Sequence, residues 1–294
     1  MKKRFLTVLF SLLFASVSPA VSAPVIASER SEAWQSLPVS APVIASEARQ
    51  SLPVSAPAVA SEARQSLISA YTTYYSQNDG GRCANIDLAA SCIDGIILQA
   101  YGEFSFNQTV GERTAKAGYQ KAKVISKGEF VQGIGGGVCQ VSTTLYNAAL
   151  LAGLTVEEYH PHSLCVSYVP PSRDAMVSAF SDLKLFNPYS FPVRFCLQVK
   201  KGALRSEIYG EKLSYTYAIE SETIKEIDAD PPIEKESETD GIIRNECKGL
   251  LSRSYLLRYV NGSLVERKKL REDSYAPIRG IVGKKIPFAT KKMP

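Results

Sequence analysis

The stretch FVQGIGGGVCQVSTTLYNAALLAGL, residues 130–154, lies near the middle of the chain. Several glycines precede Cys139, and apolar residues then recur at helical spacing at Val141, Leu145 and Ala152. Glycines allow backbone conformations that other residues avoid, so a tight turn is expected before the helix. The stretch therefore predicts a glycine-rich turn that leads into one central helix, with Cys139 at its beginning.

Strand-like segments surround this predicted helix. Residues 85–98 predict a short helix that passes into a strand, and 121–133 have the pattern of a hairpin. Further strands are expected at 102–111, 155–169, 183–187, 192–200 and 203–210. One clear helix among many strands indicates an α+β fold with mostly antiparallel strands, rather than a parallel α/β sheet.

The two ends of the chain differ in composition from the middle. Three basic residues and a short apolar core at the beginning are typical of a secretory signal peptide. Three Pro/Ser/Ala-rich repeats follow, and an Asn-Gly pair near the other end predicts a hairpin. We predict a signal peptide at 1–23, a repetitive spacer at 24–67, the folded domain at 68–220, an acidic linker at 221–240 and a small β extension at 241–294.

Export and charge limit the kinds of partner. The signal peptide predicts an exported protein of the periplasm or cell envelope, with no membrane span beyond a possible uncleaved signal anchor. Removing Lys2, Lys3 and Arg4 lowers the net charge from +5 to about +2. This near balance does not indicate a nucleic-acid partner. The sequence leaves the oligomeric state open.

Cys139 is the first candidate for chemistry. Unpaired N–H groups and the dipole at a helix N-terminus favour a thiolate, which is the nucleophilic form of cysteine. Successive N–H groups in the glycine turn (Gly135, Gly136 and Gly137) can form a nest for an oxyanion. Alternatively, Cys139 is one half of a disulfide, since the chain has six cysteines and predicted export.

The two histidines of the chain supply the candidate bases. His160 and His162 lie about 20 residues after Cys139, on the strand predicted to follow its helix. A base oriented by a carboxylate would complete a Cys-His-Asp arrangement, and Asp174 or Asp182 are the nearest downstream acids. The alternative is that both histidines are ordinary polar residues at a strand end.

A metal site is a further alternative. Cys139, His160, His162 and Cys165 are ligand types that zinc accepts, but paired Cys-x-x-Cys motifs are absent from the sequence. The glycine run also lacks the Lys-Ser/Thr pair of a phosphate-binding loop. We therefore predict no metal and no cofactor.

The block GGGVCQVSTTLYNAALLAGL, together with NIDLAA, GEFSFNQTVGERT, HPHS and VSYVPPSRDAMVS, resembles the VanW family from about residue 82 to 210. The resemblance implies a cell-envelope protein, and some members resemble L,D-transpeptidases that act on peptidoglycan stem peptides. It implies Cys139 as the nucleophile, His162 as the preferred base with His160 as the second candidate, and Asp174 as the orienting acid.

Two functions follow from this resemblance. The first is an exported cysteine acyl transferase on peptidoglycan stem peptides, with substrate-binding candidates Gly135, Gly136, Gly137, Gln140 and Ser142. The second is a non-catalytic envelope module that binds peptidoglycan and is linked to glycopeptide resistance, with Cys139 in a structural role. The C-terminal β extension weakly resembles a G5 module.

Overall fold

The structure, a computed structural model, describes residues 65–126 and 128–285. The predicted signal peptide and nearly all of the predicted spacer lie outside the described residues. The described chain is an α+β protein that is rich in antiparallel strands and has three helices. The α+β class is therefore confirmed. A helix is present at both places where one was expected, and the third helix, Phe106–Val110, lies where a strand was expected.

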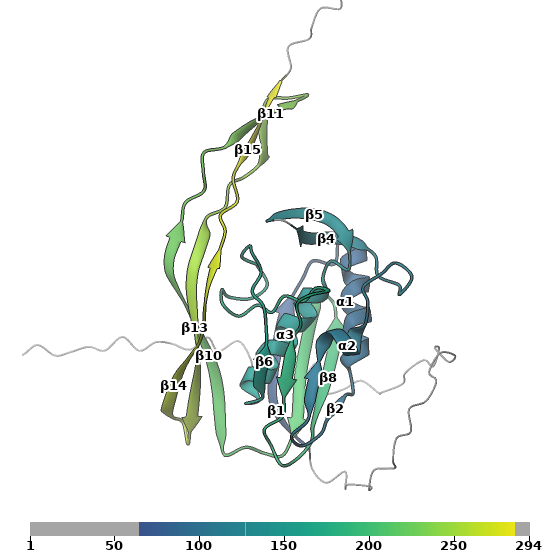
Figure 1. The fold of residues 1–294 in the computed structure, drawn as a ribbon, viewed down its shortest axis with the longest axis vertical. Coiled ribbons are helices and arrows are strands. Elements are labelled where there is room, and N and C mark those ends of the chain that lie inside the picture. Colours follow the sequence, from purple (N-terminus) through teal and green to yellow (C-terminus); the bar gives the residue numbers. More distant parts are fainter. Residues whose placement is uncertain (1–64, 127, 286–294) are drawn as a thin grey trace, which may run out of the picture. The chain divides into compact units, whose positions relative to one another are not determined.

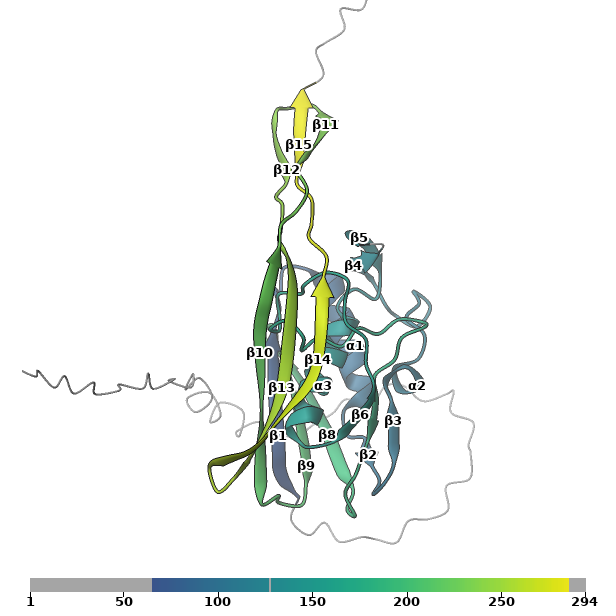
Figure 2. The same cartoon turned by 60° about the vertical axis from the view of Figure 1, so that its left-hand side comes forward.

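A four-stranded antiparallel sheet forms the centre of the domain (Figure 1). Two helices cover one face of it, as Figures 1 and 2 both show, and their apolar side chains form the core with those of the sheet. In sheet order the strands are β1 (Ser66–Tyr74), β9 (Ala203–Gly210), β8 (Val193–Lys200) and β2 (Ile97–Leu98), and the helices are α1 (Gly80–Ile93) and α3 (Val138–Leu151).

Shorter elements surround this core. They are β3 (Glu103–Ser105), α2 (Phe106–Val110), β4 (Lys121–Ser126), β5 (Glu129–Ile134), β6 (Thr155–Glu158) and β7 (Lys184–Phe186).

Two of the predicted strands are shorter than expected. The strand predicted at 102–111 changes into helix α2 after three residues, because Ser105 caps that helix by accepting the N–H of Gln108. The strand predicted at 155–169 ends at Glu158, and a loop follows.

The C-terminal part consists of two three-stranded sheets. Its strands are β10 (Tyr215–Ile227), β11 (Ile233–Ser237), β12 (Gly241–Arg244), β13 (Gly249–Val260), β14 (Ser263–Tyr275) and β15 (Ile281–Lys285), with orders β10-β13-β14 and β11-β15-β12. The acidic segment 221–240, expected to be a linker, instead supplies much of β10 and all of β11. The predicted hairpin at Asn261-Gly262 is confirmed, since both residues have positive φ between β13 and β14.

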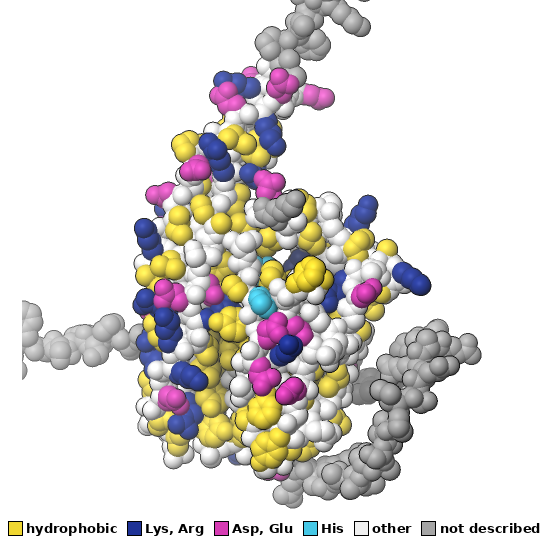
Figure 3. Space-filling view, in the orientation of Figure 1, with side chains coloured by type: hydrophobic (Ala, Val, Ile, Leu, Met, Phe, Trp, Pro, Cys, Tyr) yellow, Lys and Arg dark blue, Asp and Glu magenta, His cyan; other side chains and the backbone are white. Residues whose placement is uncertain are grey.

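The sheet β10-β13-β14 has one face toward the domain and one toward solvent. Ile219, Leu256 and Leu270 pack against the domain core. Acidic and basic side chains intermix along the edge that Figure 3 shows at the left, over this sheet, and several of them form ion pairs. The extension is thus joined to the domain by apolar contacts on its inner face.

The chain enters α3 through a tight turn. Gly135 and Gly137 have φ values of 85° and 109°, a region that favours glycine. A Cβ on Gly136 would lie 2.6 Å from the carbonyl oxygen of Lys123, so β4 approaches this residue too closely for any side chain. The turn therefore fixes the position at which α3 begins, and with it the position of Cys139.

Candidate active site

Cys139 lies in the first turn of α3 and is half-buried. Its thiol is free, and Sγ lies 3.4 Å from the carbonyl oxygen of Val177. Burial raises the pKa of the Cys139 thiol, but a hydrogen bond from His162, the charge of His162 and the bond at Val177 outweigh burial, so the pKa lies below its usual value. A thiol in this setting favours the thiolate.

His162 lies on the loop that follows β6 and is buried. Its Nδ1 is 2.6 Å from Oδ2 of Asp174, and its backbone N–H donates to the same oxygen at 2.7 Å. Burial lowers the pKa of His162, but the hydrogen bonds to Asp174 and Cys139 and the charges of both groups raise it to about 9. Since Nδ1 faces Asp174, Nε2 is the nitrogen left for Cys139.

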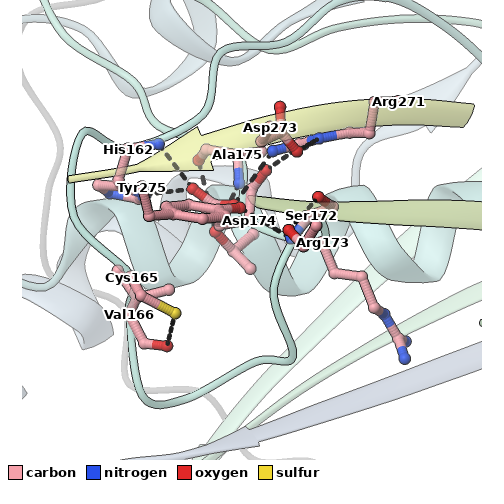
Figure 4. Close-up of polar contacts among 12 residues, drawn as sticks. His162, Cys165, Val166, Ser172, Arg173, Asp174, Ala175, Arg271, Asp273 and Tyr275 are labelled. Carbon is pink, nitrogen blue, oxygen red and sulfur yellow. Dashed lines mark hydrogen bonds and ion pairs between the residues drawn. The ribbon is translucent and has the colours of Figure 1, made fainter. Parts of the chain in front are cut away.

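Asp174 is buried and is held from two sides (Figure 4). While Oδ2 faces His162, Oδ1 accepts the hydroxyl of Tyr275 at 2.5 Å and Nη2 of Arg271 at 3.1 Å. Burial raises the pKa of Asp174, but the hydrogen bond to His162 and the charge of Arg271 lower it further than burial raises it. Asp174 is therefore a carboxylate that orients His162 and stabilises its protonated form.

A cleft of about 750 Å³ opens next to this group. Both Cys139 and His162 line it, so the thiol and the imidazole border space that a ligand can occupy. The glycine turn, the hairpin β4–β5 and the loop after Asp174 supply most of the other walls, with the side chains of Arg82, Asn107, Arg113, Lys123, Phe130, Tyr168 and Met176 among them.

The other candidates for base and acid lie elsewhere. His160 is half-exposed, and its Nε2 is 3.0 Å from Oε1 of Glu158. The two histidines do not share one strand face, because the loop after β6 buries His162 and leaves His160 near the surface. Asp182 accepts the hydroxyl of Ser105 and caps α2, with no role beside a histidine.

The predicted substrate-binding residues divide into two groups. Gly135, Gly136 and Gly137 line the cleft together with Cys139. Gln140 also lines it, but its amide is bonded to Arg82, Thr73 and Tyr74.

Ser142 is fully buried and donates to the carbonyl of Ala175 at 2.6 Å. Its hydroxyl is therefore used in the packing of the loop that carries Asp174 against α3. Ser142 thus has its hydroxyl turned into the protein, whereas Gln140 lines the cleft with an amide that already has protein partners. Contact of either residue with substrate stays a prediction.

Sequence reasoning missed Arg271 and Tyr275, which contact Asp174 from a strand about one hundred residues later in the chain. It also missed Tyr168, a cleft residue that is near enough to Cys139 and Asp174 for their charges to raise its pKa, in addition to the larger effect of its own burial. A usable signal was the cluster of one basic and two acidic residues next to a tyrosine, REDSY, within the predicted β extension.

The described residues contain neither a cluster of metal-ligand side chains nor a helix that could cross a membrane. No group of three or more His, Cys, Asp or Glu side chains in 65–126 and 128–285 has the arrangement of a metal site. No helix within these residues has the length and apolar character needed to cross a membrane.

Part of the chain is similar to known proteins. Residues 81–209 match the family model described as VanW like protein. "Uncharacterized protein YoaR" of Bacillus subtilis (strain 168) is 44% identical over 127 residues, which are 43% of this chain and 42% of the relative. The chain thus matches less than half of the relative's length.

One solved structure is similar to a smaller part of the chain. The "IgA1 Protease G5 domain structure" is 23% identical, covers 24% of this chain and 92% of its own chain, and has a TM-score of 0.17, which is too low to support an inference about the fold. The family match, by contrast, spans Cys139, His162 and Asp174. Residues 81–209 of this chain are thus similar to the family described as VanW like protein.

Proposed function

We propose that this protein is a cysteine acyl transferase of the cell envelope that acts on peptidoglycan stem peptides, as L,D-transpeptidases do. The observation that carries the proposal is the chain of contacts from Cys139 through His162 to Asp174 beside an open cleft. A lowered thiol pKa, a protonated imidazole and an orienting carboxylate are the parts that nucleophilic catalysis by cysteine requires.

The reaction begins with attack of the Cys139 thiolate on the carbonyl carbon of a peptide amide. The C–N bond breaks, and the leaving amine takes the proton of the His162 imidazolium, which leaves a thioester on Sγ. An amine of a second stem peptide then attacks the thioester carbonyl and gives its proton back to His162. The C–S bond breaks, and the thiolate returns.

The first turn of α3 supplies a donor for the oxyanion of each step. The N–H groups of Val138 and Gln140 already bond to the carbonyls of Gly135 and Gly137. The N–H of Cys139 lies between them, and the first N–H groups of a helix have no partner within that helix. We assign the Cys139 N–H as an oxyanion donor, in the way that backbone donors stabilise acyl-transfer intermediates.

The charge of the cleft supports a peptide substrate that carries carboxylates. Arg82, Arg113 and Lys123 line the cleft, against the single acidic residue Glu112. The guanidinium of Arg82 donates to the neutral amide of Gln140 at 2.7 Å, so its charge is not cancelled by that contact. Stem peptides bear free carboxylates, which three nearby cations attract.

The test is cross-link formation by the full chain with purified disaccharide–tetrapeptide stems, followed by mass spectrometry. We expect 3→3 cross-linked dimers with the wild type and none with Cys139→Ser, which is nearly isosteric. Hydrolysed tripeptide without dimers would make water the acceptor and the protein a peptidase. Equal dimer formation by wild type and Cys139→Ser would reject the assignment of the nucleophile.

A matched control separates loss of the thiol from damage to the fold. Cys196→Ser alters a half-buried cysteine on β8, and this residue does not line the cleft. Its activity should equal that of the wild type. A different outcome is that the wild type and Cys196→Ser make no product but bind stem peptides, and that Cys139→Ser binds them equally well. The non-catalytic envelope module then becomes the better description.

A further inference from the structure

We propose that the C-terminal strand β14 is part of the active site: Arg271 and Tyr275 are positioning residues that hold Asp174 so that one carboxylate oxygen faces His162. This inference rests on the proposed function for its meaning in catalysis. It concerns the extension that the sequence indicated as an appendage after the folded domain. We call Arg271, Asp273 and Tyr275 the β14 clamp.

The clamp makes the two oxygens of Asp174 different from each other. Oδ2 accepts two N–H groups of His162, while Oδ1 accepts Tyr275 and Arg271, so each oxygen has two donors. A carboxylate with four donors in fixed directions cannot rotate without breaking charge-assisted hydrogen bonds. The clamp thereby selects the orientation in which Oδ2 meets Nδ1.

Arg271 is itself fixed on every side. Its Nη1 donates to the backbone carbonyl of Asp174 at 2.6 Å, and its Nε donates to Oδ2 of Asp273 at 2.6 Å. The guanidinium also lies 4.6 Å from the centre of the Tyr159 ring, next to β6. The side chain is 1% exposed, so its charge acts on Asp174 with little screening by water.

Tyr275 connects the clamp to the loop that carries Asp174. Its hydroxyl donates to Asp174 and accepts the backbone N–H of Ser172 at 2.7 Å. Ser172 has a φ of 57° and shares a hydrogen bond of 2.7 Å with Ser252 on β13. The extension therefore holds both the carboxylate and the backbone two residues before it, as Figure 4 shows for the side chains.

Loss of the clamp should raise the pKa of Asp174. Arg271 and Tyr275 both lower the pKa of Asp174, and the other titratable groups facing it are His162 and, with weaker effects, Cys165 and Tyr168. Without the clamp, Asp174 takes up a proton at higher pH, and a neutral carboxyl no longer stabilises the imidazolium of His162. The thiolate of Cys139 then also persists only at higher pH.

The experiment measures alkylation of Cys139 by iodoacetamide against pH, in the full chain, with the modified peptide quantified by mass spectrometry. Tyr275→Phe keeps the ring and removes only the hydroxyl. We expect the acid limb of the profile to move to higher pH by about one unit, and the alkylation rate on that limb to fall about tenfold. Tyr255→Phe, which removes a surface hydroxyl bonded to Glu222, should leave the profile unchanged.

A second pair of variants keeps the test decisive if Tyr275→Phe does not fold. Arg271→Gln should shift the acid limb further than Arg271→Lys, which retains the charge and loses the forked geometry. Arg267→Lys on the exposed part of β14 is the matched control. Profiles equal to that of the control, in folded Tyr275→Phe or Arg271→Gln, would overturn the positioning role.

The same measurements separate this inference from the proposed function. Alkylation needs no stem peptide, so a shifted profile supports the clamp even if no cross-links form. Cross-linking by the wild type with unshifted profiles in the clamp variants would support the function and reject the clamp. In a cross-linking assay we expect the clamp variants to lower kcat and leave KM nearly unchanged, because neither residue lines the cleft.

Discussion

The two ends of strand β14 carry the same kinds of side chain in opposite surroundings. Near its beginning, Arg267 pairs with Glu220 at 3.1 Å, and both side chains are more than 40% exposed. Near its end, Arg271 pairs with Asp174 at 3.1 Å, and both are 1% exposed. Water screens the first pair and hardly reaches the second. Two ion pairs of the same length should therefore contribute very differently to stability, because only one of them is screened by water.

The largest effect is expected where a buried charge loses its partner. Asp174→Asn leaves Arg271 with one acidic neighbour, Asp273, in a site closed to water. We expect the free energy of unfolding to fall by about 3–5 kcal/mol, as for other broken buried pairs. Urea unfolding of the full chain measures this. Glu266→Gln, at an exposed pair with Arg258, is the control, and equal losses in the two variants would contradict the comparison.

The two histidines of the site differ in the same way, since His162 is buried and His160 is half-exposed. His162→Ala removes a buried base, so we expect the cross-linking rate at neutral pH to fall by about 10²–10⁴-fold. The alkylation rate should fall by about tenfold or more, because the fraction of thiolate decreases. His160→Ala removes a half-exposed partner of Glu158 and should change the rates less than about fivefold. Alkylation and cross-linking rates of both purified variants show which histidine is the base. A larger loss in His160→Ala would reverse the assignment of the base.

The pH dependence of cross-linking by the wild type tests the role of buried His162 without any mutation. The reactive ion pair exists above the lowered pKa of Cys139 and below the pKa of His162, which is about 9. Cross-linking should fall as pH rises through about 9, since His162 loses the proton it gives to the leaving amine. The raised pKa of His162 also stabilises the fold fully below pH 6.5, and that contribution disappears through about pH 9. Constant cross-linking activity up to pH 11 would exclude this role.

The smallest effect is expected at the exposed end of β14. Arg267→Ala breaks the pair with Glu220 and a contact with the Tyr255 ring, 3.4 Å from its centre. We expect a stability change of less than about 1 kcal/mol that shrinks further in high salt. Thermal unfolding at two salt concentrations measures both. A loss as large as that of Asp174→Asn would show that exposure does not govern these pairs.

Local sequence patterns predicted much of the fold. Helical spacing located α3, and turn residues located the hairpins at β4–β5, β8–β9 and β13–β14. Patterns failed where contacts distant in sequence decide the conformation. The segment around His162 alternates like a strand, but its backbone and ring bond to Asp174, and these contacts stabilise a loop in place of a sheet ladder.

The site was predictable to a similar degree. Cys139, His162 and Asp174 lie within one contiguous region, and their residue types suggest their chemistry. The partners of Gln140 were not predictable, because its position in the sequence does not tell that its amide bonds to Thr73 while the residue lines the cleft. Arg271 and Tyr275 were missed because a charged strand near a chain end looks solvated until tertiary packing is known.

The position of the β14 clamp in the chain also has a consequence for timing. The ribosome makes Cys139, His162 and Asp174 first, and Arg271 follows Asp174 by 97 residues. Until β14 is synthesised and paired with β13, the carboxylate lacks two of its four donors. With the clamp acting as we propose, Cys139 stays a weak nucleophile in the growing chain and gains its full reactivity only after β14 has been made and has paired with β13. The order of synthesis thus delays the reactivity of the thiol until a strand about one hundred residues after Asp174 is in place.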